Sequence, residues 1–110
     1  MRRAARQDAN HKEIVKALVG AGAVVCDLSG VGNGCPDILV GFSGRTFLLE
    51  IKDGSKLPSQ RKLTEDQVIW HNRWTGGTLR IVESIEAALA VIHGNNTTDT
   101  VESTTGISRD

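Results

Sequence analysis

The most constraining feature of the sequence is a pair of strand-forming segments, "DILVGF" and "RTFLLEIK", which lie on either side of Ser43-Gly44 within residues 37–52. Two such segments separated by two small residues predict a tight β-hairpin. If Ser43 and Gly44 form the turn, pairing outward along the hairpin puts Asp37 directly opposite Glu50. Their β-carbons would then be roughly 4.5 to 5.5 Å apart. A three-residue loop would shift the register by one and separate the two acids.

Asp37, Glu50 and Lys52 share one face of this hairpin, because strand side chains alternate with a period of two. Two carboxylates about 5 Å apart repel by roughly 3 kcal/mol at an effective dielectric constant near 20. A divalent cation between them reverses that effect, and oxygen ligands suit Mg²⁺ or Mn²⁺. The backbone carbonyl of Ile51 is a third candidate ligand, and the Lys52 ammonium could hold a water or neutralise charge on a phosphate.

An alternative interpretation needs no chemistry. In this alternative, Asp37 caps a turn after Pro36, and Glu50 and Lys52 are exposed strand charges that form a weak ion pair. The predicted register favours the metal site, because it brings both acids and the lysine to one place.

The rest of the chain predicts a single α/β domain with a mixed four-stranded sheet flanked by helices. Apolar periodicity, glycine stops and a possible Thr64/Gln67 capping box define the elements. Their order is helix (10–19), strand (23–28), strand (37–42), strand (45–52), helix (64–74), strand (78–82) and helix (84–94). We expect a basic N-terminal arm at 1–9, the folded domain at 10–94, and a disordered Ser/Thr/Asn-rich tail at 95–110.

Composition narrows the class of protein but does not select a function. The chain has 110 residues, 39% hydrophobic and 24% charged, with a formal net charge of zero. These values are those of an ordinary globular protein, and a neutral charge neither supports nor excludes a nucleic-acid partner. The basic N-terminus lacks an apolar segment of the kind found in secretory signals, so we expect a cytoplasmic protein with no membrane partner and reduced Cys26 and Cys35 thiols.

The residues around the hairpin resemble the PD-(D/E)XK nuclease motif. "PD" at 36–37 is followed, after twelve residues, by "EIK" at 50–52, with "HKEIVKAL", "GVGNGCPDILVG" and "LTEDQVIWHNRWTGG" around them. Together these segments look like the small stand-alone VRR-NUC-type members often encoded by phages, over about residues 10–93. The resemblance implies a restriction-endonuclease-like core, location in the bacterial host cytoplasm if phage-encoded, and a homodimer with two sites.

The resemblance also implies roles for individual residues. Asp37 and Glu50 would bind Mg²⁺ or Mn²⁺, Lys52 would position or activate the water, and Gln67 would orient groups beside the site. Glu13 matches an acidic position that faces the metal in many members. The alternatives are a solvent-facing Glu13 paired with a nearby lysine, and a Gln67 that only caps its helix, a role compatible with the functional one.

Other residues have two readings each. Trp70 and Trp74 lie on one helical stripe, for which core packing is favoured and base stacking is the alternative. His71 is a candidate second proton carrier or an ordinary surface residue. The DNA-contact candidates, which could equally be solvated basic residues, are Lys56, Arg61, Lys62, Arg2, Arg3 and Arg6.

The leading hypothesis is a metal-dependent endodeoxyribonuclease that hydrolyses DNA phosphodiester bonds. With no recognisable base-reading module, a structure-selective activity on Holliday junctions or other branched DNA is favoured over a defined sequence. One alternative is a nicking, restriction-type or flap nuclease acting with a phage partner. An alternative of another class is a non-catalytic DNA-binding or assembly module that keeps the nuclease fold.

Overall fold

The structure, a computed structural model, describes residues 8–94 of the chain. Its helices and strands follow the predicted order, with a short 3₁₀ turn as the one addition. The elements are α1 (His11–Gly20), β1 (Val24–Asp27), β2 (Ile38–Phe42), β3 (Arg45–Ile51), η1 (Pro58–Gln60), α2 (Glu65–Arg73), β4 (Thr78–Val82) and α3 (Ile85–Ile92). The predicted tail at 95–110 and most of the predicted arm at 1–9 lie outside the described residues.

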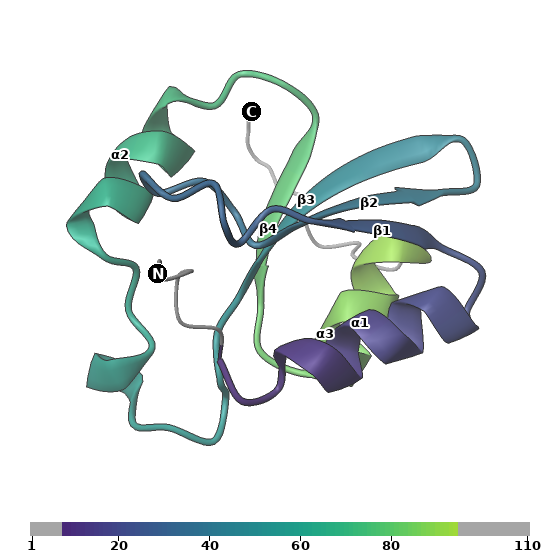
Figure 1. Cartoon of the computed structure of the whole chain (residues 1–110), viewed down its shortest axis with the longest axis horizontal. Helices are drawn as coiled ribbons and strands as arrows, with labels where there is room; N and C mark the ends of the chain where they lie inside the picture. Colours follow the sequence, from purple (N-terminus) through teal and green to yellow (C-terminus); the bar gives the residue numbers. More distant parts are fainter. Residues whose placement is uncertain (1–7, 95–110) are drawn as a thin grey trace.

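The four strands form one mixed sheet in the order β1-β2-β3-β4 (Figure 1). β1, β2 and β3 pair antiparallel, whereas β4 lies parallel to β3 after the crossover that contains α2. In the β2–β3 hairpin Phe42 pairs with Arg45, which confirms the predicted register. Ser43 and Gly44 have φ angles of 52° and 79°, and two successive positive values match the type I′ turn that suits a two-residue hairpin.

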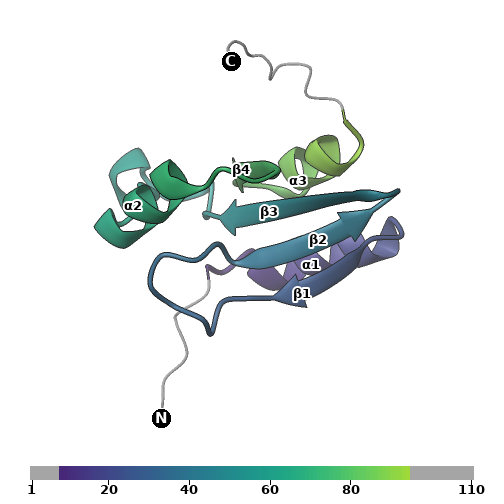
Figure 2. The ribbon, with the colours of Figure 1, turned by 90° about the horizontal axis from the view of Figure 1, so that it is seen from above.

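The hydrophobic core lies between one face of the sheet and the helices α1 and α3 (Figures 1 and 2). Helical spacing places Ile14 and Leu18 on the buried side of α1, and Ala88 and Ile92 on the buried side of α3. The strands supply the facing layer, namely Ile38, Val40, Phe47, Leu49, Ile51 and Val82. Burial of each large apolar side chain contributes about 1.5 to 3 kcal/mol, so this face supplies most of the stability.

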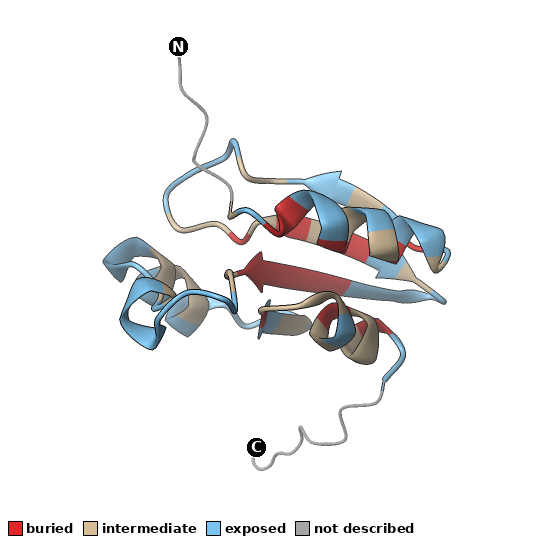
Figure 3. Cartoon of the chain, turned by 90° about the horizontal axis from the view of Figure 1, so that it is seen from below, coloured by how far each residue is buried: buried red, intermediate tan, exposed pale blue. Residues whose placement is uncertain are grey.

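Helix α2 lies at one end of the sheet, apart from α1 and α3, and none of its residues is buried (Figure 3). Val68 and Ile69 are 41% and 49% exposed, and Trp74 is 38% exposed. The favoured core role for Trp70 and Trp74 is therefore wrong. Helical spacing correctly put the two rings on one face, but it could not show whether that face would pack into the core. No helix within residues 8–94 is long and apolar enough to cross a membrane.

Candidate active site

The two predicted acids meet at the open end of the β2–β3 hairpin. The regular ladder ends at the pair Ile38 and Leu49, one step before Asp37 and Glu50. The Asp37 N–H donates to the carbonyl of Leu49 at 3.1 Å, and Asp37 Oδ2 accepts a hydrogen bond from the N–H of Ile51 at 2.7 Å. The Asp37 side chain is thus fixed by the backbone of β3, although the two acids do not form a regular ladder pair.

Glu50 is a buried acid, with 1% of its surface exposed on the central strand β3. Burial, the negative charge of Asp37 and a hydrogen bond between the two carboxyl groups raise its pKa to about 8, against a smaller opposing effect of Lys52. Near neutral pH the metal-free pair therefore keeps a proton that the two acids share. The neighbouring Cys35 thiol has a pKa raised by burial and then by Glu50 and Asp37, which keeps it protonated.

Lys52 and Gln67 complete a polar network around Glu50. Lys52 Nζ donates to Gln67 Oε1 at 2.9 Å and lies 3.9 Å from Glu50 Oε2. Gln67 Nε2 donates to the same Glu50 oxygen at 3.0 Å. The Gln67 amide thereby connects the cationic and anionic side chains. Strand alternation predicted that Lys52 lies on the face of the acids, and the family resemblance implied that Gln67 lies beside them.

The helix cap holds Gln67 in this position. The Thr64 N–H donates to Gln67 Oε1 at 2.9 Å, and the Gln67 N–H donates to Thr64 Oγ1 at 3.2 Å, which forms the predicted capping box. The same amide oxygen accepts from Thr64 and from Lys52. Capping and alignment of the site are therefore two functions of one side chain.

His71 approaches Glu50 from the next turn of α2. Its Nε2 lies 3.9 Å from Glu50 Oε1, and both atoms are buried without a hydrogen-bond partner among the described residues. Burial and the charge of Lys52 lower the pKa of His71, so the imidazole is neutral at physiological pH. Once the pair loses its shared proton, a buried carboxylate oxygen without a protein donor is a natural place for a cation.

The donor set fits a small hard cation. Asp37 and Glu50 offer carboxylate oxygens, and Mg²⁺ is commonly held by one or two carboxylates while it keeps several waters. Within residues 8–94, no three His, Cys, Asp or Glu side chains form a ready-made metal cluster, so water would have to fill the remaining positions. The Ile51 N–H bonds to Asp37, and a ligand role for the Ile51 carbonyl stays a prediction.

Glu13 does not join the acid pair to form such a cluster. It is exposed on α1 and lines a hollow that also contains Asp53 and Glu83. Asp8, which precedes α1, is instead the acid near the N-terminus whose charge raises the pKa of Glu50. The sequence offered no signal that would choose Asp8 over Glu13.

Asn10 is a structural contributor that the sequence did not reveal. It is buried beside the start of α1, and its Nδ2 donates to the backbone carbonyls of Lys52 and Glu83 at 3.1 and 3.2 Å. The Asn10 amide thus ties α1 to the ends of β3 and β4 next to the acid pair. In the sequence this asparagine marked only a helix start.

The predicted basic residues divide into two groups. Arg61 donates to both carboxylate oxygens of Glu83 at 3.1 and 3.3 Å and to the Lys56 carbonyl at 2.9 Å, so it braces the loop before α2. Lys56 and Lys62 are exposed on this loop. Arg2, Arg3 and Arg6 lie outside the described residues.

Comparison with known proteins adds no assignment to this geometry. A scan against protein-family models, a search of curated proteins and a search of solved structures each found no match. The resemblance to PD-(D/E)XK nucleases therefore depends on the residues of this chain alone.

Proposed function

We propose that this protein is a metal-dependent endodeoxyribonuclease that hydrolyses phosphodiester bonds in DNA and prefers branched structures such as Holliday junctions. The observation that carries the proposal is the buried Glu50 carboxyl, held against Asp37 with Lys52 and Gln67 beside it. A structural role alone gives no reason to bury Glu50 beside a half-buried Asp37, with a lysine side chain only 12% exposed next to them.

The acid pair is evidence for a metal site, because both carboxyl groups can ionise fully only beside an added positive charge. In the metal-free protein a shared proton neutralises part of the charge of Asp37 and Glu50. Mg²⁺ or Mn²⁺ would replace that proton, held by these two carboxylates, with the Ile51 carbonyl as a further proposed ligand. When bound, such an ion supplies Lewis acidity toward a phosphate oxygen and lowers the pKa of water.

The side chains around the pair have separate roles in this proposal. Lys52 holds the attacking water or stabilises negative charge that develops on the phosphate. Gln67 fixes the Lys52 ammonium relative to Glu50, and is a positioning residue. His71, which is neutral and lies beside Glu50, can accept or return a proton during the reaction.

Recognition of DNA structure is favoured over recognition of a base sequence. Within residues 8–94 no helix-turn-helix or other major-groove reading element is present, since the three helices either cover the core or carry the candidate site. The exposed Lys56 and Lys62 offer sequence-independent phosphate contacts beside α2. A homodimer, which the resemblance implies, would place two sites on one junction and allow paired cuts.

The test is a cleavage assay with Mg²⁺ and with Mn²⁺ on matched four-way junction, flap, nicked and linear DNA. We expect cleavage of the branched substrates, and loss of cleavage in Asp37→Ala and Lys52→Ala with circular dichroism spectra like that of the wild type. Lys16→Ala, an exposed lysine on α1, is the control for loss of a positive charge.

Two results would contradict the proposal in different ways. Intact substrates in every condition would reject the nuclease activity and favour the non-catalytic DNA-binding alternative if the protein still binds DNA. Cleavage that is equal on linear and branched DNA would keep the nuclease and reject the structural preference.

A further inference from the structure

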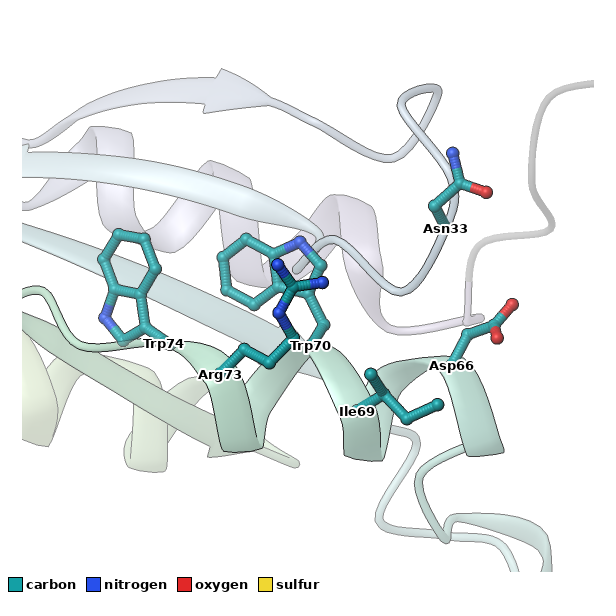
Figure 4. Close-up of a pocket in the computed structure, with 6 residues that line it drawn as sticks. All are labelled: Asn33, Asp66, Ile69, Trp70, Arg73 and Trp74. Atoms are coloured by element: carbon teal, nitrogen blue, oxygen red, sulfur yellow. The ribbon is translucent and has the colours of Figure 1, made fainter.

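A pocket of about 340 Å³ lies beside the candidate site, between α2 and the loop that joins β1 to β2. Its size is at the lower end of the range for small-ligand sites. Figure 4 shows Asn33 and Asp66 at one end and Trp74 at the other, with Trp70 and Arg73 between them. The lining residues are Asn33, Asp66, Ile69, Trp70, Arg73 and Trp74.

The aromatic wall of this pocket, formed by a half-buried Trp70 and an exposed Trp74, is fixed in place. The rings of Trp70 and Trp74 stack with centroids 5.2 Å apart and an interplanar angle of 15°. Trp74 Nε1 donates to the Gly77 carbonyl at 2.8 Å, and a β-carbon at Gly76 would come within 2.4 Å of the Trp74 ring. The backbone at Gly76 and Gly77 therefore presses against this ring and orients it, so a planar ligand would meet a preorganised surface.

The loop wall is fixed as well. Gly34 has a φ of 84°, and a β-carbon at this position would lie 2.2 Å from the Asp66 carbonyl oxygen. Only glycine allows both this backbone conformation and this close contact. The glycine thereby holds the loop, with Asn33 next to it, against the start of α2.

The polar groups of the pocket match a nucleobase attached to a phosphate backbone. The Asn33 amide and the Asp66 carboxylate offer a donor and acceptors for the edge of a base. Arg73 offers a planar cation for a phosphate. The tryptophan pair offers a flat face on which a base can continue the stack, an interaction that tolerates any base.

The pocket is next to the acid pair. Trp70, which lines it, packs edge-on against His71 with ring centroids 6.5 Å apart, and His71 Nε2 lies 3.9 Å from Glu50 Oε1. Asp66 and Gln67 are adjacent in sequence, with one lining the pocket and the other bonded to Glu50. A nucleotide in the pocket would therefore lie close to a phosphate bound at the acid pair.

We propose that this pocket binds one unpaired nucleobase of the DNA substrate, stacked on the Trp70/Trp74 pair. This inference rests on the proposed function, which supplies DNA as the ligand. A base inside a duplex has both faces covered by its neighbours, so only a single-stranded, branch-point or extruded nucleotide can occupy the pocket. Selection for branched DNA then has a physical source, because a junction, flap or gap supplies such nucleotides near the cut.

Intrinsic fluorescence tests this directly, because Trp70 and Trp74 are the only two tryptophans of the chain and both line the pocket. The full chain is titrated in EDTA, so that nothing is cut, with a single-stranded oligonucleotide of about 12 nucleotides. A second oligonucleotide of equal length and charge carries abasic sites. We expect the first to quench the fluorescence, and the abasic one to bind about 5- to 150-fold more weakly.

Variants separate stacking from simple electrostatic attraction. Trp74→Ala should weaken binding of the base-bearing oligonucleotide to the level of the abasic one, with Trp70 still reporting, and Trp74→Phe should restore part of the difference. Val68→Ala, an exposed residue on the same helix outside the pocket lining, should leave binding unchanged. Because α2 contributes no buried residue and Trp74, which follows it, is 38% exposed, we expect all these variants to keep the fold, which circular dichroism checks.

Equal affinity for base-bearing and abasic DNA would overturn the proposal that the pocket binds a base, and so would binding without quenching. A pocket that binds a peptide instead would also give equal affinity for the two oligonucleotides. The two proposals fail separately. Base-dependent quenching without cleavage in any metal would keep the base pocket and reject the nuclease. If wild type and Trp74→Ala cleave DNA at equal rates and neither shows base-dependent binding, the nuclease is kept and the base pocket is rejected.

Discussion

The face of the sheet covered by α1 and α3 and the end of the molecule formed by α2 differ in what they contribute. The first buries a continuous set of apolar side chains, including Ile14 and Leu49, whereas α2 buries none. Yet α2 supplies Gln67 and His71 to the acid pair, and carries most of the pocket beside it. Stability and proposed chemistry therefore come from different parts of this small domain.

Strand β3 belongs to both parts. Leu49 and Ile51 point into the core, whereas the intervening Glu50 and the following Lys52 belong to the polar network on the other side. Packing of Leu49 and Ile51 in the core fixes the backbone of β3, and this in turn fixes the positions of Glu50 and Lys52 on the opposite face. The core thus preorganises the acid site even though it shares no side chain with it.

The same substitution on the two helices gives the largest contrast. Ile14→Ala in α1 removes a fully buried side chain and should cost about 2 to 5 kcal/mol of unfolding free energy. Ile69→Ala in α2 removes one that is 49% exposed and should change it by less than about 0.5 kcal/mol. Urea denaturation measures both. Similar losses would show that α2 is packed into the cooperative unit, against the division described above.

Gln67→Ala should affect activity more than stability. It breaks the link between Lys52 and Glu50, so we expect cleavage to slow by about 10- to 100-fold, as for other residues that orient a metal site. Thr64→Ala is the matched control, because it removes the same helix cap at a cost of about 1 kcal/mol without touching Lys52 or Glu50. Equal rate losses in both variants would assign the effect to the cap.

Glu50 makes the metal-free stability depend on pH. Its folded pKa of about 8 exceeds the ordinary value of 4.5, so the folded state binds more protons than the unfolded one between these values, and stability falls as pH rises through this window. His71, whose folded pKa is lowered, acts in the opposite direction only below about 6.5. The slope should be close to roughly 1.4 kcal/mol per pH unit near pH 6.5 and should fall to about half of that at pH 8, where the folded protein has half released the proton.

Urea midpoints measured in EDTA across pH 6.5 to 8 check this, with Glu50→Gln as the comparison. The variant should show a flat profile, because its amide donates to Asp37 without titrating. A wild-type midpoint that rises with pH in this window would show that Glu50 is already ionised in the folded state.

Gly34→Ala tests the close packing between the β1–β2 loop and the start of α2. The positive φ alone should cost about 1 to 2 kcal/mol, and the clash with the Asp66 carbonyl adds to this cost because a backbone group must move. The change should reduce both cleavage and fluorescence quenching. Gly30→Ala, in the same loop with open space around it, should behave like the wild type. Unchanged quenching in Gly34→Ala would show that the loop wall is not needed for the pocket.

Sequence patterns predicted the hairpin and its register well. Ser43-Gly44 allowed one dominant turn, and apolar alternation then fixed which residues face the core, so the approach of Asp37 to Glu50 followed from local rules. The capping box at Thr64 and Gln67 was equally local. These features depend on neighbours along the chain or directly across a hairpin, where periodicity is informative.

The contributions of Asp8, Asn10 and the tryptophan pair could not be predicted in this way. Each depends on how elements far apart in sequence come together, as in the bond of Asn10 to the carbonyl of Glu83. For Trp70 and Trp74, helical spacing gave the shared face, but only the fold shows that neither ring joins the hydrophobic core formed within residues 8–94.

By itself, the sequence determined the elements, the hairpin register and the grouping of Asp37, Glu50 and Lys52 on one face, because backbone geometry repeats every two residues in a strand. The tertiary structure decided which groups surround that face. It buried Glu50 enough to raise its pKa, brought Gln67 and His71 from α2, and left the tryptophan pair open. Burial and electrostatic environment are properties of the packed chain, and no local pattern encodes them.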